Sequence, residues 1–148
     1  MDRRNMLRAA AALGAVFSAS RASAATENTA ETKLKVVYHL SDLEKVHFVL
    51  GNIQNHLDGA GGPDRVTIAL VVHGPALRDF QTKQANPEMT QHVGKLSKAG
   101  VGFAACGNTM KSQKITLGDL LPGFVTADKG GVVRIAELQS QGYLYLRP

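Results

Sequence analysis

The chain has 148 residues, of which 44% are hydrophobic and 20% are charged. This composition is typical of a globular protein and excludes a largely disordered chain, and the length fits one domain. The formal net charge of +5 would suit a nucleic-acid binder. Most of that excess lies in residues 1–24, however, and the rest of the chain has no basic run or stripe interleaved with aromatic residues. We therefore expect no nucleic-acid binding.

The first 24 residues have the three parts of a cleavable export signal. Basic residues come first, residues 9–20 are weakly apolar, and Ala22-Ser23-Ala24 forms an A-x-A cleavage site. The adjacent Arg3 and Arg4 resemble a twin-arginine signal. We expect cleavage after Ala24 and a periplasmic location.

The apolar part of this signal is too short to remain in a membrane, because spanning the bilayer takes about 20 residues. We expect no permanent membrane span. Residues 25–32 are small and polar and predict a flexible lead-in, so that residues 33–148 form the folded domain.

The chain contains one cysteine, Cys106. A single cysteine allows no disulfide within the chain and no cysteine-rich metal site. In an exported protein such a thiol is either buried and inert or kept for its reactivity, and the sequence leaves both open.

The first half of the domain alternates strand and helix patterns. Residues 33–40 are β-branched and apolar and predict a buried strand, and Ser41 and Glu44 fit a capping box. Apolar residues at helical spacing follow and Gly59 ends the helix; they are Leu43, Val46, Leu50, Ile53 and Leu57. A second strand is predicted over 65–72 and a short helical turn over 76–80.

The second half continues the alternation. Asn86-Pro87 predicts a helix start, with Met89, Val93 and Leu96 on one face before Gly100. The patterns then predict a strand over 101–105, a short helix over 116–121, a strand over 124–126, a helix over 131–141 and a strand over 143–147. The apolar residues of the last helix are Val132, Ile135, Ala136 and Leu138. We predict an α/β fold with a parallel sheet covered on both faces.

Three residues capable of chemistry end the first three predicted strands: His39, His73 and Cys106. In an open parallel sheet, ligands bind beyond the carboxyl ends of the strands. The small turn Gly107-Asn108-Thr109 can direct backbone amides at the sulfur and lower its pKa. Each residue also has a purely structural interpretation, because cysteine is often a buried apolar residue and histidine often caps a strand end.

The remaining histidines are His47, His56 and His92, and no two histidines have the i, i+4 spacing of helical metal sites. We expect no metal site. The sequence has no nucleophile elbow, phosphate loop or dinucleotide fingerprint at a strand end, and we expect no cofactor.

The domain resembles the DsrE/DsrF-like family, and in particular its exported members. The stretches that carry the resemblance are 101–110 (VGFAACGNTM), 119–123 (DLLPG) and 135–148 (IAELQSQGYLYLRP), with looser matches at 36–39 (VVYH) and 71–74 (VVHG). The resemblance implies a three-layer α/β/α sandwich with a five-stranded parallel sheet, assembled as trimers or hexamers. It also implies that Cys106 matches a cysteine that carries persulfide sulfur to a partner protein in cytoplasmic members.

Two functions remain open from the sequence. In the first, the protein is a periplasmic sulfur carrier that receives sulfur from a donor protein or small compound. Cys106 holds persulfide sulfur, Asn108 and backbone amides stabilise the sulfur anion, and His73 or His39 manages protons. In the second, it is a non-enzymatic oligomeric protein that binds a small ligand in a pocket at the strand ends.

Overall fold

The computed structural model describes residues 33–148. Five strands and four α-helices form the domain, with three short 3₁₀ segments at 43–45, 74–80 and 117–119. The strands are β1 (Leu34–Leu40), β2 (Val66–Val72), β3 (Gly102–Cys106), β4 (Phe124–Ala127) and β5 (Leu144–Leu146). The helices are α1 (Val46–Ala60), α2 (Pro87–Lys98), α3 (Gly107–Gln113) and α4 (Gly131–Ser140).

The five strands form one sheet in the order β4-β3-β2-β1-β5, and every neighbouring pair is parallel. All carboxyl ends of the strands therefore lie at one edge of the sheet. This confirms the predicted α/β fold with a five-stranded parallel sheet.

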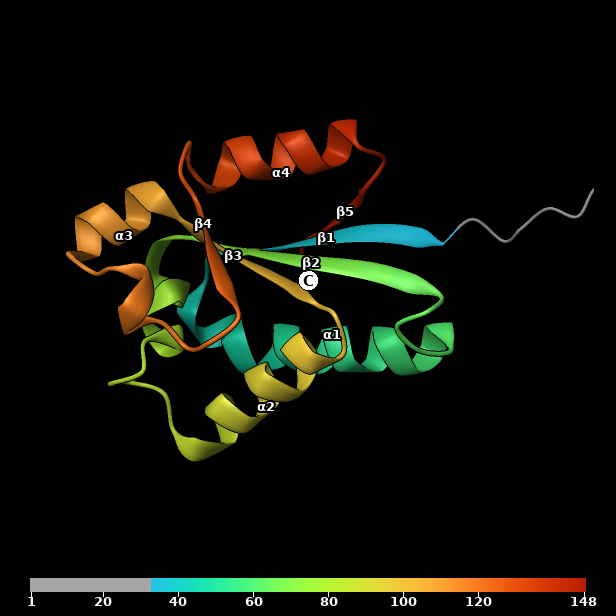
Figure 1. The fold of residues 1–148 in the computed structure, drawn as a ribbon, viewed down its shortest axis with the longest axis horizontal. Coiled ribbons are helices and arrows are strands. Elements are labelled where there is room, and N and C mark those ends of the chain that lie inside the picture. The colour runs from blue at the N-terminus through green and yellow to red at the C-terminus, as the bar shows by residue number, and fades with distance from the viewer. Residues whose placement is uncertain (1–32) are drawn as a thin grey trace, which may run out of the picture. The chain divides into compact units, whose positions relative to one another are not determined.

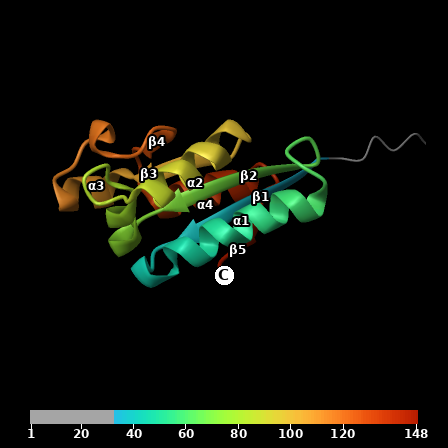
Figure 2. The same cartoon turned by 90° about the horizontal axis from the view of Figure 1, so that it is seen from below.

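Helices cover both faces of the sheet, as the two views of the ribbon show: α1 and α2 lie on one face and α4 on the other (Figures 1 and 2). The larger hydrophobic cluster joins the sheet to α1 and α2. The smaller cluster lies under α4 and consists of Val37, Val71, Ala104, Ile135 and Leu138. The α4 face thus has much less buried apolar surface than the opposite face.

Local sequence explains the start of α2 and the end of α1. Asn86 caps α2 by accepting a hydrogen bond from the Met89 amide at 2.7 Å, as expected of asparagine before a helix-starting proline. The end of α1 lies two residues beyond the predicted one, because the left-handed cap (φ 89°) is formed by Gly61 and not by Gly59.

Several local predictions are wrong. Residues 107–109, predicted as a turn, form the start of helix α3. Ser41 and Glu44 form no capping box: the Ser41 hydroxyl donates to Asp42, and the chain enters α1 through a 3₁₀ turn that has no side-chain cap. A capping box exists instead between Thr116 and Asp119.

The predicted apolar face of the last helix also differs from the observed one. Ile135 and Leu138 are buried, but Ala136 is exposed and Val132 is 69% exposed. One stripe of α4 is enough to contact the sheet, which leaves the other apolar residues in solvent. None of the helices within residues 33–148 is both long and apolar enough to cross a membrane.

Candidate functional site

The structure places all three predicted strand-end residues at the carboxyl edge of adjacent strands. Cys106 is the last residue of β3, His73 directly follows β2, and His39 is the next-to-last residue of β1. The order of the sheet sets β2 between β1 and β3, so His73, at the end of β2, lies between the other two residues along this edge. The edge divides into a sulfur site at Cys106 and an imidazole pair formed by His39 and His73.

The sulfur of Cys106 is nearly covered, with 6% of the residue exposed. Burial, the largest single effect, raises the pKa of the thiol. Hydrogen bonding to the sulfur from the Thr109 hydroxyl and from the backbone amides of Thr109, Gly131 and Asn108 outweighs burial, and the pKa of Cys106 lies below its ordinary value. The surroundings of Cys106 therefore favour the thiolate.

Asn108 contributes to this site through its backbone amide. Its side-chain nitrogen lies against Gly130: a β-carbon added at Gly130 would be 2.8 Å from Asn108 Nδ2. The expected stabilisation of sulfur by Asn108 thus comes from main chain, and residue 108 need not be asparagine to supply it.

Gly131 brings the start of α4 against both parts of the edge. A β-carbon added at this glycine would lie 3.3 Å from Cys106 Cβ, 3.4 Å from His73 Cβ and 3.4 Å from Val71 Cγ1. The absence of a side chain at Gly131 lets its amide approach the sulfur. It also shows that Cys106 and His73 contact the same small volume.

Thr109 connects the sulfur site to the turn after β2. Its hydroxyl oxygen accepts a hydrogen bond from the Gly74 amide at 3.0 Å, while the hydroxyl hydrogen is directed to the Cys106 sulfur. Gln113 of α3 donates to the Gly74 carbonyl at 3.0 Å. Both main-chain groups of Gly74 are thereby tied to α3.

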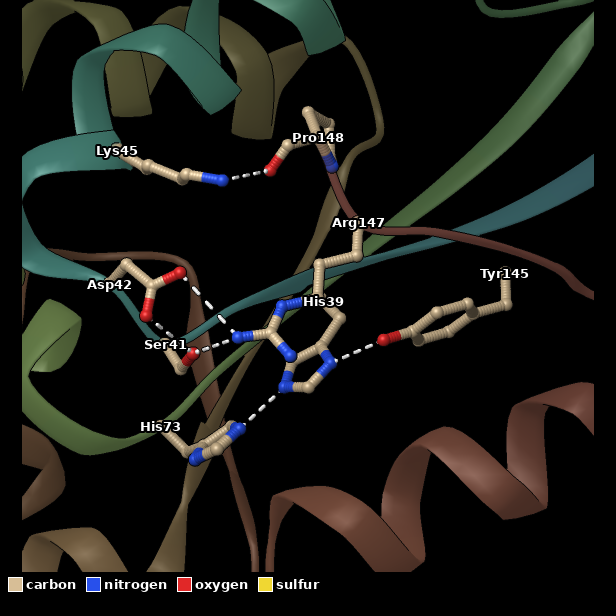
Figure 3. Close-up of polar contacts among 8 residues, drawn as sticks. All are labelled: His39, Ser41, Asp42, Lys45, His73, Tyr145, Arg147 and Pro148. Carbon is tan, nitrogen blue, oxygen red and sulfur yellow. Dashed lines mark hydrogen bonds and ion pairs between the residues drawn. The ribbon is translucent and has the colours of Figure 1, made fainter.

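The imidazole pair is drawn in Figure 3. The Nε2 atoms of His39 and His73 are hydrogen-bonded to each other, and the ring centroids are 4.7 Å apart at an interplanar angle of 22°. The other ring nitrogen of His39, Nδ1, is 2.7 Å from the hydroxyl oxygen of Tyr145 in β5. Three side chains, from β1, from β5 and from the residue directly after β2, thus form one chain of hydrogen bonds.

Both imidazoles are held in the neutral form. Burial lowers the pKa of His39 most, and the positive charge that His73 can carry and the Arg147 guanidinium lower it further; Asp42 opposes them. Burial is also the main cause of the lowered pKa of His73, again with Arg147 lowering it and Asp42 raising it. At neutral pH the pair can therefore pass or share a proton without carrying a fixed charge.

Arg147 ties the end of the chain to the turn after β1. Its Nη2 donates to the Ser41 hydroxyl at 3.0 Å and forms an ion pair with Asp42 at 3.5 Å, while Lys45 donates to the Pro148 carbonyl at 3.1 Å (Figure 3). Tyr145 and Arg147 are not among the site residues predicted from the sequence. Both lie in the stretch 135–148, which carried the family resemblance, but residues 143–147 were interpreted only as a strand.

The other histidines do not join this edge. His56 Nδ1 is 2.9 Å from the Tyr38 hydroxyl on the α1 face of the sheet, and His92 lies on α2. Within residues 33–148, no group of three or more histidine, cysteine, aspartate or glutamate residues is arranged to hold a metal ion.

A hollow of about 370 Å³ lies beside the sulfur site, between β4 and the first turns of α4. Ala127 of β4 lines this hollow and pairs with Cys106 in the sheet. Its other lining residues are Ala104, Val125, Thr126, Asp128, Lys129, Gly130, Arg134 and Glu137.

Comparison with solved structures finds the same fold in proteins of three organisms. A protein of unknown function from Methanobacterium thermoautotrophicum, MTH1491, is 27% identical, with a TM-score of 0.67, over 78% of this chain and 99% of that one. The ychN protein from E. coli is 14% identical (TM-score 0.60, 78% and 100% covered). BT1422 from Bacteroides thetaiotaomicron, a conserved protein of unknown function, is 13% identical (TM-score 0.58, 82% and 100% covered).

A search of curated proteins gives no match. A family model does match, under the description DsrE/DsrF-like family, and it covers residues 6–148. Because this match extends over nearly the whole chain, the protein belongs to the DsrE/DsrF-like family.

Proposed function

We propose that the protein is an exported sulfur carrier in which Cys106 holds sulfane sulfur as a persulfide. The observation that carries this proposal is the environment of the sulfur: one hydroxyl and three backbone amides lower the pKa of a thiol that burial alone would raise. A cysteine that serves only as an apolar core residue needs no such set of donors. The family membership is consistent with this chemistry.

Loading requires only a persulfide donor, RSSH. The Cys106 thiolate attacks the terminal sulfur of the donor, a new S–S bond forms at Sγ, and the S–S bond of the donor breaks. The donor leaves as the thiolate RS⁻, and Cys106 becomes the persulfide Cys–SSH. One sulfur atom moves with no net oxidation or reduction, and the same amides that favoured the thiolate now face a persulfide anion after it loses its proton.

Unloading is the reverse displacement. An acceptor thiolate attacks the terminal sulfur of the Cys106 persulfide, and Cys106 leaves as a thiolate. A low pKa makes Cys106 a good leaving group, because thiols of lower pKa depart faster. His73 and His39, neutral at pH 7, lie at the same edge of the sheet and are placed to exchange protons with the sulfur compounds that arrive and leave.

A second candidate function is a ligand-binding protein without sulfur chemistry. Two observations favour it: Cys106 is only 6% exposed, and the hollow beside it has room for a small molecule. In this alternative the thiol is a packing residue, and ligand binding does not depend on it.

The test is the mass of the purified protein before and after incubation with polysulfide. A carrier gains one or more sulfur atoms, the gain is removed by a reducing thiol, and Cys106→Ser gains none. The serine variant is a fair control because it is nearly isosteric and the chain has no other cysteine. A wild-type protein that gains no sulfur under these conditions, while remaining folded, would favour the binding protein.

We propose export to the periplasm, with removal of residues 1–24, which lie outside the described residues. The support for this proposal is the order of the segment's parts: basic residues come first, then a weakly apolar stretch, then an A-x-A cleavage site. Protein recovered from the periplasm should begin at Ala25 by intact mass, and replacing Arg3 and Arg4 by lysine should leave the precursor in the cytoplasm. Full-length protein in the membrane fraction would contradict this proposal.

We further propose a homo-oligomer, a trimer or a hexamer. Large apolar residues remain exposed on the thinly covered α4 side and on the edge strands, among them Val125, Val132, Val133, Leu144 and Leu146. Such surfaces on a small domain favour association. Light scattering at micromolar concentration should return a multiple of the chain mass, and charged replacements at Val125 and Val132 should reduce it.

A further inference from the structure

The hydrogen-bond chain from Tyr145 through His39 to His73 can be protonated in two directions. In one, the Tyr145 hydroxyl donates to His39 Nδ1, so His39 carries its proton on Nε2 and donates to His73 Nε2. In the other, His73 Nε2–H donates to His39 Nε2, and His39 Nδ1–H donates to the Tyr145 oxygen. Each direction fixes the tautomer of both neutral imidazoles.

The first direction pairs the better donor with the better acceptor. A phenol O–H is a stronger donor than a neutral imidazole N–H, and an imidazole nitrogen is a stronger acceptor than a phenol oxygen. Both histidines are neutral at pH 7, since burial lowers their pKa values. The contact between Tyr145 and His39 is 2.7 Å, which fits a hydroxyl donating to a ring nitrogen.

We propose that Tyr145 is a positioning residue that, through His39, holds His73 in the tautomer protonated at Nδ1. The assignment of this tautomer does not depend on the proposed sulfur chemistry; only the role given to the tautomer rests on that proposed function. Tyr145 lies in β5, at the opposite side of β1 from β2, so the last strand of the sheet acts on the histidine beside Cys106 through one intermediate ring.

The consequence is an N–H group available next to the sulfur site. Nδ1 of His73 has no hydrogen-bond partner within residues 33–148, whereas Nε2 is occupied by His39. Nδ1 is the ring nitrogen nearer the main chain, and the β-carbons of His73 and Cys106 contact the same volume beside Gly131. His73 is therefore placed to donate a hydrogen bond to an anionic sulfur compound bound beside Cys106, such as the departing thiolate of a donor.

The tautomers are measured by nitrogen-15 NMR of the imidazole rings in the full chain at about pH 8, where the histidines are neutral. Single His39→Gln and His73→Gln variants assign the signals. We expect His39 protonated at Nε2 and His73 at Nδ1. In Tyr145→Phe, His73 should shift toward a mixture with the Nε2–H form. Tyr143→Phe is the matched control, because Tyr143 lies two residues away and its ring contacts Lys35 outside this chain of hydrogen bonds.

A wild-type His73 protonated at Nε2, or a Tyr145→Phe variant with unchanged tautomers, would overturn the proposal. Sulfur loading is then compared in the same variants. Losing one oriented hydrogen bond should slow loading by about three- to tenfold in Tyr145→Phe and leave Tyr143→Phe unchanged. Altered tautomers with an unaltered loading rate would refute the link to Cys106. If wild type loads no sulfur at all, the carrier function fails while the tautomer result stands.

Discussion

The sulfur of Cys106 and the imidazole pair lie at the same edge of the sheet but are held by different kinds of contact. Main-chain amides of residues 108, 109 and 131, with one hydroxyl, surround the sulfur. The imidazole pair has side-chain partners instead, drawn from β1, β5 and the turn after β2. One part of the site depends on how closely the backbone approaches, and the other on which side chains are present.

This difference determines which substitutions each part of the site tolerates. The sulfur site is sensitive to added volume at the glycines that let α4 come close, and insensitive to most side-chain changes around it. The imidazole pair should respond to the loss of a single hydroxyl or charge, and among the glycines near α4 only to added volume at Gly131, which packs against His73. Substitutions that affect one part and spare the other test this separation.

The largest effect is expected for Gly130→Ala. Gly130 has φ 102° and ψ 158°, a conformation that only glycine adopts readily, and an added β-carbon would lie 2.8 Å from Asn108 Nδ2. We expect the free energy of unfolding to fall by roughly 2–4 kcal/mol, measured by urea denaturation. Alkylation of Cys106 should also change, because the start of α4 must shift.

Gly59→Ala is the matched control for this substitution. Gly59 is exposed in α1, and a β-carbon there meets no atom within 4 Å. Alanine should leave the protein as stable or add up to about 1 kcal/mol, since alanine favours helix over glycine. Equal stability of the Gly130→Ala and Gly59→Ala variants would show that α4 is not held close to the sulfur.

A smaller effect is expected for Thr109→Val, which removes the hydroxyl between Gly74 and the sulfur. The pKa of Cys106 should rise, because a hydrogen bond to the thiolate is lost. The Gly74 amide also loses its acceptor, at a cost of about 1 kcal/mol in stability. Asn108→Ala should leave the pKa of the thiol nearly unchanged, since residue 108 acts through its amide. The pH dependence of alkylation distinguishes the two variants, and a larger change in Asn108→Ala would contradict the assignment.

The smallest effect concerns the stability of the imidazole pair in acid. Because the pKa values of His39 and His73 are lowered in the folded state, the unfolded chain binds protons more readily once the pH falls below its histidine pKa of about 6.5. Stability should therefore be lost as the pH falls through about 6.5 toward the lowered pKa values of the folded pair. A His39→Gln, His73→Gln double variant should lose less over that range in urea unfolding. An identical loss in both proteins would show that the pair does not resist protonation.

The difference between local features and contacts of distant residues explains how much of the site could be predicted from the sequence. Strand ends are local features, so the patterns placed His39, His73 and Cys106 at one edge, and the glycine-containing turn after Cys106 indicated amide donors. Gly131 could not be found this way, because its contact with Cys106 joins residues 25 positions apart through the packing of α4. Tyr145 and Arg147 are 106 residues from their partners His39 and Ser41. Only the order of the sheet, with β5 beside β1, brings them together.

Activation of the Cys106 thiol in spite of its burial underlies the proposed function. It is tested most directly by the rate at which iodoacetamide alkylates the folded wild-type protein as the pH is varied, with Cys106→Ser as the blank. We expect alkylation without unfolding and a thiol pKa below that of a free cysteine, about 8.5. A thiol that reacts only after unfolding, or one that titrates above the free value, would show that Cys106 is a packing residue.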